Sequence, residues 1–195
     1  MNMPLDLPSD VPDEALLVLY ANGDAGAARA LTLRLAPMAL RVAGRMLADR
    51  SEAEDVAQEA MLRLWRIAPD WRQGEAKVST WLYRVVSNLC TDRLRRRGRS
   101  VALDAVAEPV DERPGAVAGL MEADRASALD AALAALPDRQ RQAVVLRHLE
   151  GLTNPEIAGI MEIGVEAVES LTARGKRALV TALVGRREEL GYDNG

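Results

Sequence analysis

Two helical patterns of opposite chemical character restrict what this chain can fold into. The first, Ser79–Arg99 (STWLYRVVSNLCTDRLRRRGR), combines aromatic side chains with a cluster of arginines. The second, Leu152–Leu179 (LTNPEIAGIMEIGVEAVESLTARGKRAL), has the spacing of a helix-turn-helix. Exposed rings and guanidinium groups can stack on unpaired bases and hold phosphates, whereas a helix-turn-helix reads duplex DNA. The pair predicts a helical protein that contacts DNA at two places, one of them opened.

The composition favours helices throughout the chain. Phenylalanine is absent, β-branched runs are few, and Ala, Leu, Arg and Glu are abundant, so we predict an all-α fold. For 195 residues of which 49% are hydrophobic, two small cores fit the spacing of the motifs better than one large core. One cysteine and one histidine exclude a disulfide framework and disfavour zinc, so we expect no metal and no cofactor.

The sequence also bears on location and chemistry. No apolar run approaches the roughly 20 residues of a membrane-spanning helix, and the first residues are acidic where a secretory signal is basic. We therefore expect a cytoplasmic protein without membrane insertion. Cys90 is expected to pack in a core and His148 to lie near a helix end. Without a catalytic triad, a phosphate-binding loop or a metal-type carboxylate cluster, we expect no catalytic residues and no enzyme.

Proline, glycine and acidic residues divide the chain into two small helical modules. We predict the first module at residues 10–98, a flexible acidic linker at residues 99–122 and the second module at residues 123–186. The net charge of −4 hides a local basic patch, because five arginines lie between Arg93 and Arg99. This patch favours nucleic acid, although a solvated helix end, where arginine complements the helix dipole, is the alternative.

In the first module, Pro37 is expected to kink or break its helix. Ser51 and Glu54 form a predicted capping box, and Ser79 is predicted to cap a helix that Gly98 ends. The predicted helices of this module lie at residues 12–23, 25–48, 51–67 and 79–98.

The second module is predicted to hold four helices, the last two forming the helix-turn-helix. A second capping box is expected at Thr153 and Glu156, and the turn at Ile163 and Gly164. The predicted helices lie at about residues 124–136, 137–150, 153–161 and 165–184.

The order of these motifs resembles that of bacterial sigma factors of the extracytoplasmic-function (ECF, group IV) class. The resemblance rests on EDVAQEAMLRLW, WLYRVVSNLCTDRLRR, ALPDRQRQAVVLRHLEGLTNPEIAGIM and VEAVESLTARGKRAL, and it covers most of the chain. It implies a first module (region 2) that binds the β′ coiled coil of core RNA polymerase and melts the −10 promoter element. The second module (region 4) would bind the β flap and read the −35 duplex, and an anti-sigma factor would hold both inactive until a stress or signal.

The resemblance assigns core-polymerase binding to one face of the helix over residues 51–67. Carboxylates four residues apart lie on one helical face and can pair with arginines of the β′ subunit. A solvated acidic face is the alternative, and Trp65 can equally pack in the core. The residues implied are Asp55, Gln58, Glu59, Leu62 and Trp65.

The −10 site would lie on the loop over residues 71–78 and on the helix that follows. In the family this loop captures a base flipped from the non-template strand. Flipping the base costs stacking energy, which contacts in a pocket must offset. Either Trp81 or Tyr83 is expected to stack on bases while the other packs in the core. Glu75 stands where relatives often have an aromatic residue, so the sequence does not determine which base of the −10 element is preferred. The residues implied are Arg72, Gln73, Gly74, Glu75, Ala76, Trp81, Tyr83, Arg84, Asn88, Arg93 and Arg96.

The −35 site would lie on the recognition helix, and here the chain departs from the family. Many relatives have a basic residue at the positions of Glu169 and Leu171. Glutamate can accept a hydrogen bond from cytosine but is repelled by phosphate, so Glu169 either reads a base or only faces solvent. The residues implied are Glu169, Ser170, Arg174, Lys176 and Arg177.

Two other functions compete with a sigma factor. A helix-turn-helix regulator that binds duplex as a dimer would explain Leu152–Leu179 but would leave the segment WLYRVVSN unexplained. A helical adaptor without a DNA role would explain neither of these two segments. A regulator should bind promoter duplex alone, whereas a sigma factor usually needs core polymerase.

Overall fold

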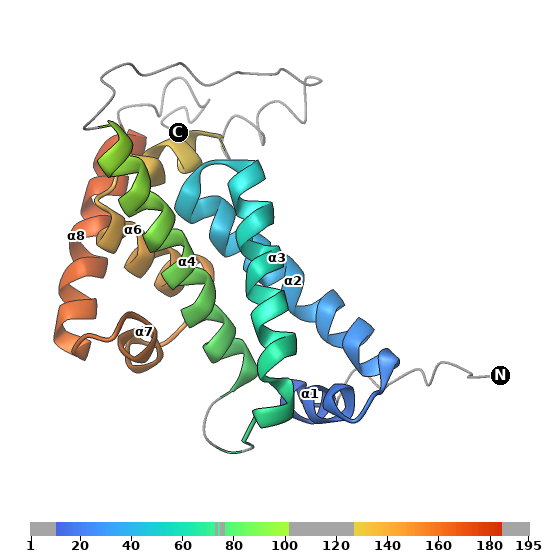
Figure 1. The fold of residues 1–195 in the computed structure, drawn as a ribbon. Coiled ribbons are helices and arrows are strands. Elements are labelled where there is room, and N and C mark those ends of the chain that lie inside the picture. The colour runs from blue at the N-terminus through green and yellow to red at the C-terminus, as the bar shows by residue number, and fades with distance from the viewer. Residues whose placement is uncertain (1–10, 73, 75–76, 102–126, 185–195) are drawn as a thin grey trace, which may run out of the picture. The chain divides into compact units, whose positions relative to one another are not determined.

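The computed structural model of this chain describes residues 11–72, 74, 77–101 and 127–184, and all secondary structure in these residues is helical (Figure 1). Most of the predicted linker lies outside the described residues. The helices are α1 (Asp13–Ala21), α2 (Ala25–Leu47), α3 (Arg50–Ile67), the 3-10 helix η1 (Ala68–Asp70), α4 (Val78–Val101), an unlabelled helix over residues 127–134, α6 (Asp138–Val144), the π-helical turn η2 (Val145–Leu149), α7 (Asn154–Met161) and α8 (Val165–Val184).

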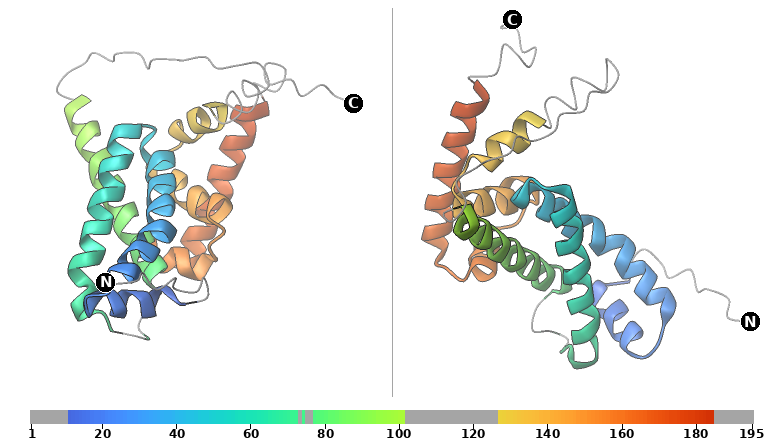
Figure 2. Two further views of the ribbon diagram at one scale, coloured as in Figure 1. Left: turned by 90° about the vertical axis from the view of Figure 1, so that its right-hand side faces the viewer. Right: turned by 45° about the horizontal axis from the view of Figure 1, so that its top comes forward.

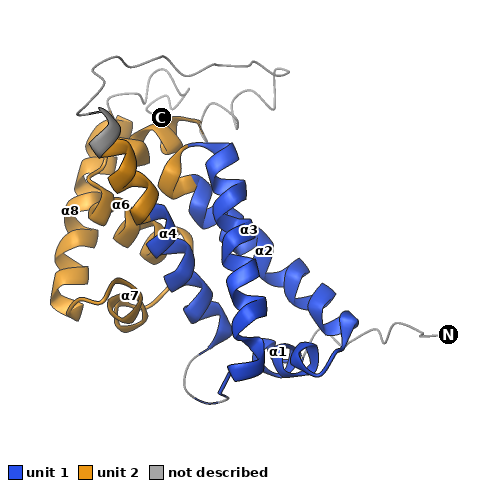
Figure 3. Ribbon diagram, viewed as in Figure 1, with its two compact units in different colours: residues 1–44, 49–90 blue, residues 45–48, 91–195 orange. Residues whose placement is uncertain are grey.

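The chain divides into two compact units (Figure 3). The first unit comprises residues 1–44 and 49–90, and the second unit comprises residues 45–48 and 91–195. The first unit holds α1, α3, most of α2 and the first half of α4. The second unit holds the rest of α4 and every later helix. An all-α chain with two helical units agrees with the prediction from composition.

The core of the first unit is built from leucine, valine and alanine. On α3, Val56, Ala60 and Leu64 lie on one helical face and have no exposed surface. Leu31 of α2 and Leu82 of α4 are equally buried. Helix α1 packs against η1 at the end of α3 (Figure 2), which closes one end of this core.

Helix starts in the first unit differ from the sequence prediction. The Asp49 carboxylate, and not the Ser51 hydroxyl, caps α3 by accepting a hydrogen bond from the Glu52 N–H at 2.9 Å. Asp49 has the extended backbone of an N-cap residue, whereas Ser51 is already helical. At α4, the Val78 N–H donates to Oε1 of Glu14 at 3.0 Å, so a side chain from α1 takes the role predicted for Ser79.

Two predicted interruptions are also wrong. Helix α2 runs unbroken through Pro37, which is exposed, so water can hydrate the carbonyl that the proline ring leaves without an N–H partner. Helix α4 continues through Gly98, which lacks the positive φ of a helix-ending glycine, and reaches Val101. Nη1 of Arg97 donates to the carbonyl of Leu47 at 3.0 Å and thereby caps the end of α2.

The second unit packs its helices around Leu133, Leu146, Ile157 and Val168, all without exposed surface. The buried Arg141 of α6 supports this core, because its guanidinium satisfies carbonyls where the helix over residues 127–134 ends. It donates to the carbonyls of Leu133 at 2.8 Å, Ala134 at 2.6 Å and Leu136 at 3.1 Å.

Helices α6 and α8 approach closely at Gly175, which is buried. A Cβ at this position would lie 2.6 Å from Cγ2 of Val144 and 3.2 Å from the carbonyl oxygen of Gln140. Real atoms do not approach so closely, so the absence of a side chain at Gly175 sets the distance between these two helices.

We therefore predict that Gly175→Ala lowers the free energy of unfolding by about 1–3 kcal/mol through overpacking. The control is Gly159→Ala in α7, where a Cβ meets nothing within 4 Å. That change should raise stability by up to about 1 kcal/mol, since alanine favours helices. Urea unfolding of both variants makes the comparison, and equal stability of the two would contradict the close packing.

Candidate functional site

The first candidate surface is an apolar groove between α2 and α3, with a volume of about 630 Å³. Its most exposed apolar side chains are Leu33 at 67%, Leu62 at 43% and Leu40 at 40%. The lining comes from Thr32, Leu33, Ala36, Pro37 and Leu40 of α2, and from Glu54, Ala57, Gln58, Met61, Leu62 and Trp65 of α3.

Three of the predicted polymerase-binding residues, Gln58, Leu62 and Trp65, line this α2–α3 groove. The α2 wall was not predicted, although Leu33, Pro37 and Leu40 recur at helical spacing on a face separate from the core stripe. The surface is therefore built from two helices, whereas the sequence motif pointed to one.

The carboxylates predicted to bind polymerase lie on α3, where Asp55 is exposed and Glu59 is half-buried. Oε1 of Glu59 accepts a hydrogen bond from Nε of Arg63 at 2.9 Å. This bond is the main reason why the pKa of Glu59 lies below its usual range. Glu59 is therefore ionised at neutral pH, with its charge partly balanced by Arg63.

Trp65 both packs against another helix and lines the exposed groove, which are the two roles that its sequence position left open. It is half-buried, and its ring lies 4.6 Å from that of Tyr20 of α1, centroid to centroid, at an interplanar angle of 53°. The same side chain lines the α2–α3 groove. Packing by Tyr20 thus holds Trp65 in place as part of the groove wall.

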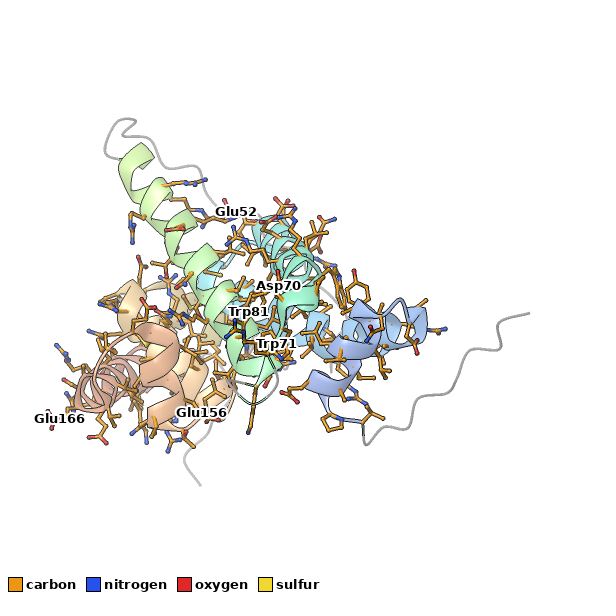
Figure 4. The ribbon with its side chains drawn as sticks, turned by 60° about the horizontal axis from the view of Figure 1, so that its bottom comes forward. Glu52, Asp70, Trp71, Trp81, Glu156 and Glu166 are labelled. Carbon is orange, nitrogen blue, oxygen red and sulfur yellow. The ribbon has the colours of Figure 1, made fainter. Side chains whose placement is uncertain are left out.

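The second candidate surface combines the loop before α4 with α4 itself. Trp71 and Trp81 lie side by side (Figure 4), with ring centroids 6.2 Å apart and the rings edge to face. Both are half-buried, and Nε1 of Trp71 is buried with no acceptor in the described part of the chain. Tyr83 is only 8% exposed, so of the two predicted stacking residues it is the one that packs in the core.

The other predicted −10 residues fall into three groups. Asn88 and Arg84 are exposed one turn apart on α4, and Arg96 is exposed near its end while Arg93 is half-buried. Arg72 and Gly74 are exposed in the preceding loop, where Gly74 has a φ of +93°. Gln73, Glu75 and Ala76 lie outside the described residues.

The third candidate surface is the helix-turn-helix of α7 and α8. The predicted capping box is present: the Thr153 N–H donates to Oε2 of Glu156 at 2.8 Å, and the Glu156 N–H donates to Oγ1 of Thr153 at 3.5 Å. Helix α7 ends at Met161, and the left-handed backbone of the next residue, Glu162 (φ 54°), begins the turn into α8. The buried Val168 then fixes which face of α8 meets the core.

Two side-chain contacts organise the exposed face of α8. Arg174 lies along the helix, because its Nη2 donates to Oγ of Ser170 at 3.0 Å and its Nε to the Ser170 carbonyl at 3.2 Å. Oε1 of Glu169 accepts from Nδ2 of Asn154 at 3.3 Å. Asn154 was not predicted, and no local pattern marks it because its partner lies on the other helix. All five predicted −35 residues are exposed, namely Glu169, Ser170, Arg174, Lys176 and Arg177.

Cys90 is buried and is in no disulfide with another described residue, in agreement with a packing role. No described helix is long and apolar enough to cross a membrane.

Comparison with known proteins identifies two regions of the chain. Residues 31–100 match the family described as Sigma-70 region 2, and residues 126–179 match Sigma-70, region 4. The ECF RNA polymerase sigma factor SigE of Mycolicibacterium smegmatis is 33% identical over 179 residues, covering 88% of this chain and 68% of that protein. The RNA polymerase sigma-H factor of Pseudomonas aeruginosa is 33% identical over 181 residues, covering 88% and 93%.

Solved structures share the fold. The sigma factor RpoE of Bartonella quintana, in complex with the anti-sigma factor NepR, has a TM-score of 0.65 at 22% identity, covering 80% of this chain and 95% of that one. CnrH, in complex with the cytosolic domain of CnrY, has a TM-score of 0.64 at 24% identity, covering 89% and 97%.

Regions 2 and 4 in this order define a transcription initiation factor of the sigma-70 type. The chain belongs to the ECF RNA polymerase sigma factors, and the resemblance seen in its motifs is confirmed.

His148, the one histidine of the chain, has a pKa below its usual value, first because of partial burial and then because of Lys176 and Arg147. We predict that its imidazole signal in an NMR titration has a midpoint below about 6.5. Lys176→Gln should move the midpoint upward. The unfolded chain takes up the proton more readily, so this contribution to stability is present above about pH 6.5 and is lost as the pH falls below it. A midpoint above 6.5 would contradict this electrostatic environment.

Proposed function

We propose that this sigma factor binds core RNA polymerase through the α2–α3 groove. The observation that carries the proposal is the combination of exposed Leu33, Leu40 and Leu62 with the charged Glu54 in the lining of one groove. Protein interfaces typically have such an apolar centre with a polar rim. The β′ coiled coil, which binds region 2 in the family, offers a helical partner with arginines for the rim.

The α4 surface is proposed to hold the melted −10 strand. Asn88 offers an amide that can bond a base edge, and exposed Arg84 and Arg96 can hold phosphates. Trp81 packs edge to face against Trp71, and this contact holds its ring in place within the surface. Only the exposed part of the Trp81 ring can stack on a base. Helix α8 is proposed to enter the major groove of the −35 duplex, with region 4 also binding the β flap.

We also infer a protein partner that keeps the factor inactive. The structural relatives RpoE and CnrH were solved in complex with NepR, an anti-sigma factor, and with the cytosolic domain of CnrY. An anti-sigma factor that covers one of the proposed surfaces would release this chain in response to stress or another signal. We further propose that the chain acts in the cytoplasm with polymerase and catalyses no reaction itself.

The function is tested with the purified full-length chain and core polymerase. Tagged protein should copurify core polymerase subunits, and the mixture should start transcription at promoters on which neither component acts alone. If the chain instead binds promoter duplex tightly as a dimer without core polymerase, it is a helix-turn-helix regulator and the proposal is wrong.

We predict that Leu33→Ala combined with Leu62→Ala weakens core polymerase binding by about 1–3 kcal/mol, because exposed leucines at the centre of an interface lose contact area. Both side chains are exposed, so helix content should not change. Leu19→Ala on α1 is the control, since its side chain is 37% exposed and does not line the groove. Fluorescence anisotropy with labelled core polymerase measures the affinities, and wild-type affinity of the double variant would exclude the groove.

We further predict that Asn88→Ala impairs strand opening, whereas Arg174→Ala impairs recruitment to the −35 element. Single-round transcription by the holoenzyme compares ordinary duplex with a template that carries a mismatch bubble at the −10 element. The bubble should restore the Asn88→Ala signal, because opening is no longer needed, and should restore Arg174→Ala much less. Equal rescue of both variants, or of neither, would refute this division between α4 and α8.

A further inference from the structure

Glu169 of the recognition helix is hydrogen-bonded to the first residue of α7. Oε1 accepts the 3.3 Å hydrogen bond from Nδ2 of Asn154, the first residue of α7. The backbone there is held by the capping box of Thr153 and Glu156. The pair therefore links the two helices of the helix-turn-helix on their exposed side.

This contact has little value for stability alone. Both side chains lie at the surface, where water competes for every hydrogen bond, and 3.3 Å is long for a bond to a carboxylate. A negative charge on a helix that approaches DNA also opposes binding, because phosphates repel it. A favourable contact between Glu169 and a base would offset this repulsion.

We propose that Glu169, positioned by Asn154, reads a cytosine in the −35 duplex. This inference rests on the proposed role of α8 in the major groove. A carboxylate only accepts hydrogen bonds, and Asn154 occupies Oε1. The second oxygen can accept from N4 of cytosine, the one base that presents a donor and no acceptor in the major groove.

The same carboxylate discriminates against the other bases by repulsion. Guanine presents N7 and O6, thymine presents O4, and adenine has the N7 acceptor beside its donor. Specificity therefore comes from unfavourable contacts as well as from one favourable contact. The positive charges of Arg174, Lys176 and Arg177 farther along α8 supply the attraction to phosphates that Glu169 does not.

The test uses full-length protein assembled with core polymerase and a promoter library randomised at every −35 position. Wild type should select cytosine, on one strand, at a position where its replacement weakens binding about tenfold. Glu169→Gln should shift that position toward adenine, since an amide can bond both N6 and N7. Asn154→Ala should flatten the preference at that position alone, because the carboxylate is no longer oriented.

Glu166→Gln is the matched control. It removes the same charge from α8 one turn earlier, and Glu166 extends outward from the helix (Figure 4). It should leave the preference at the cytosine position unchanged. A merely structural role for the Asn154 contact would change stability without changing any base preference, so selection separates the two roles.

Distinct outcomes overturn distinct claims. If Glu169→Gln selects the same bases as wild type at every position, Glu169 reads no base. If only Asn154→Ala matches wild type, Asn154 does not position Glu169. If wild-type holoenzyme selects no promoter at all, the failure lies with the proposed function and not with this pair.

Discussion

Short helices leave unpaired N–H and carbonyl groups at their ends, and this fold depends on side chains from other helices that satisfy those groups. Glu14 accepts from the N–H of Val78 across 64 positions in the chain, and Arg141 donates to three carbonyls where the helix over residues 127–134 ends. A buried polar group without a partner costs about 1–3 kcal/mol. Each of these contacts therefore ties two helices together at a defined position.

The same constraint sets the position of the functional faces. Asp49 fixes the start of α3, which carries the proposed polymerase-binding residues, and Glu14 fixes the start of α4, which carries Asn88. In the helix-turn-helix, Thr153 starts α7 and so places Asn154 opposite Glu169. Polymerase and the melted strand would therefore each meet a helix whose start is fixed by a polar contact. The duplex would meet α8, whose Glu169 is hydrogen-bonded to the capped start of α7.

This dependence also explains what the sequence could predict. The start of α7 was predicted correctly because its capping partners, Thr153 and Glu156, are three residues apart. The cap of α4 was assigned to Ser79 because the true partner, Glu14, is remote in sequence. The α2 wall of the groove was missed for another reason: helical spacing reveals an apolar stripe at Leu33 and Leu40, but does not tell whether that stripe is buried.

The central claim is that regions 2 and 4 of one sigma factor engage two elements of one promoter at the same time. The most direct measurement is transcription by the holoenzyme from templates whose −35 and −10 elements are separated by increasing spacer lengths. Inserting about five base pairs, half a helical turn, puts the two elements on opposite faces of the duplex. The account predicts that transcription is lost while each isolated element still competes for binding. Transcription that is insensitive to the spacer would contradict it.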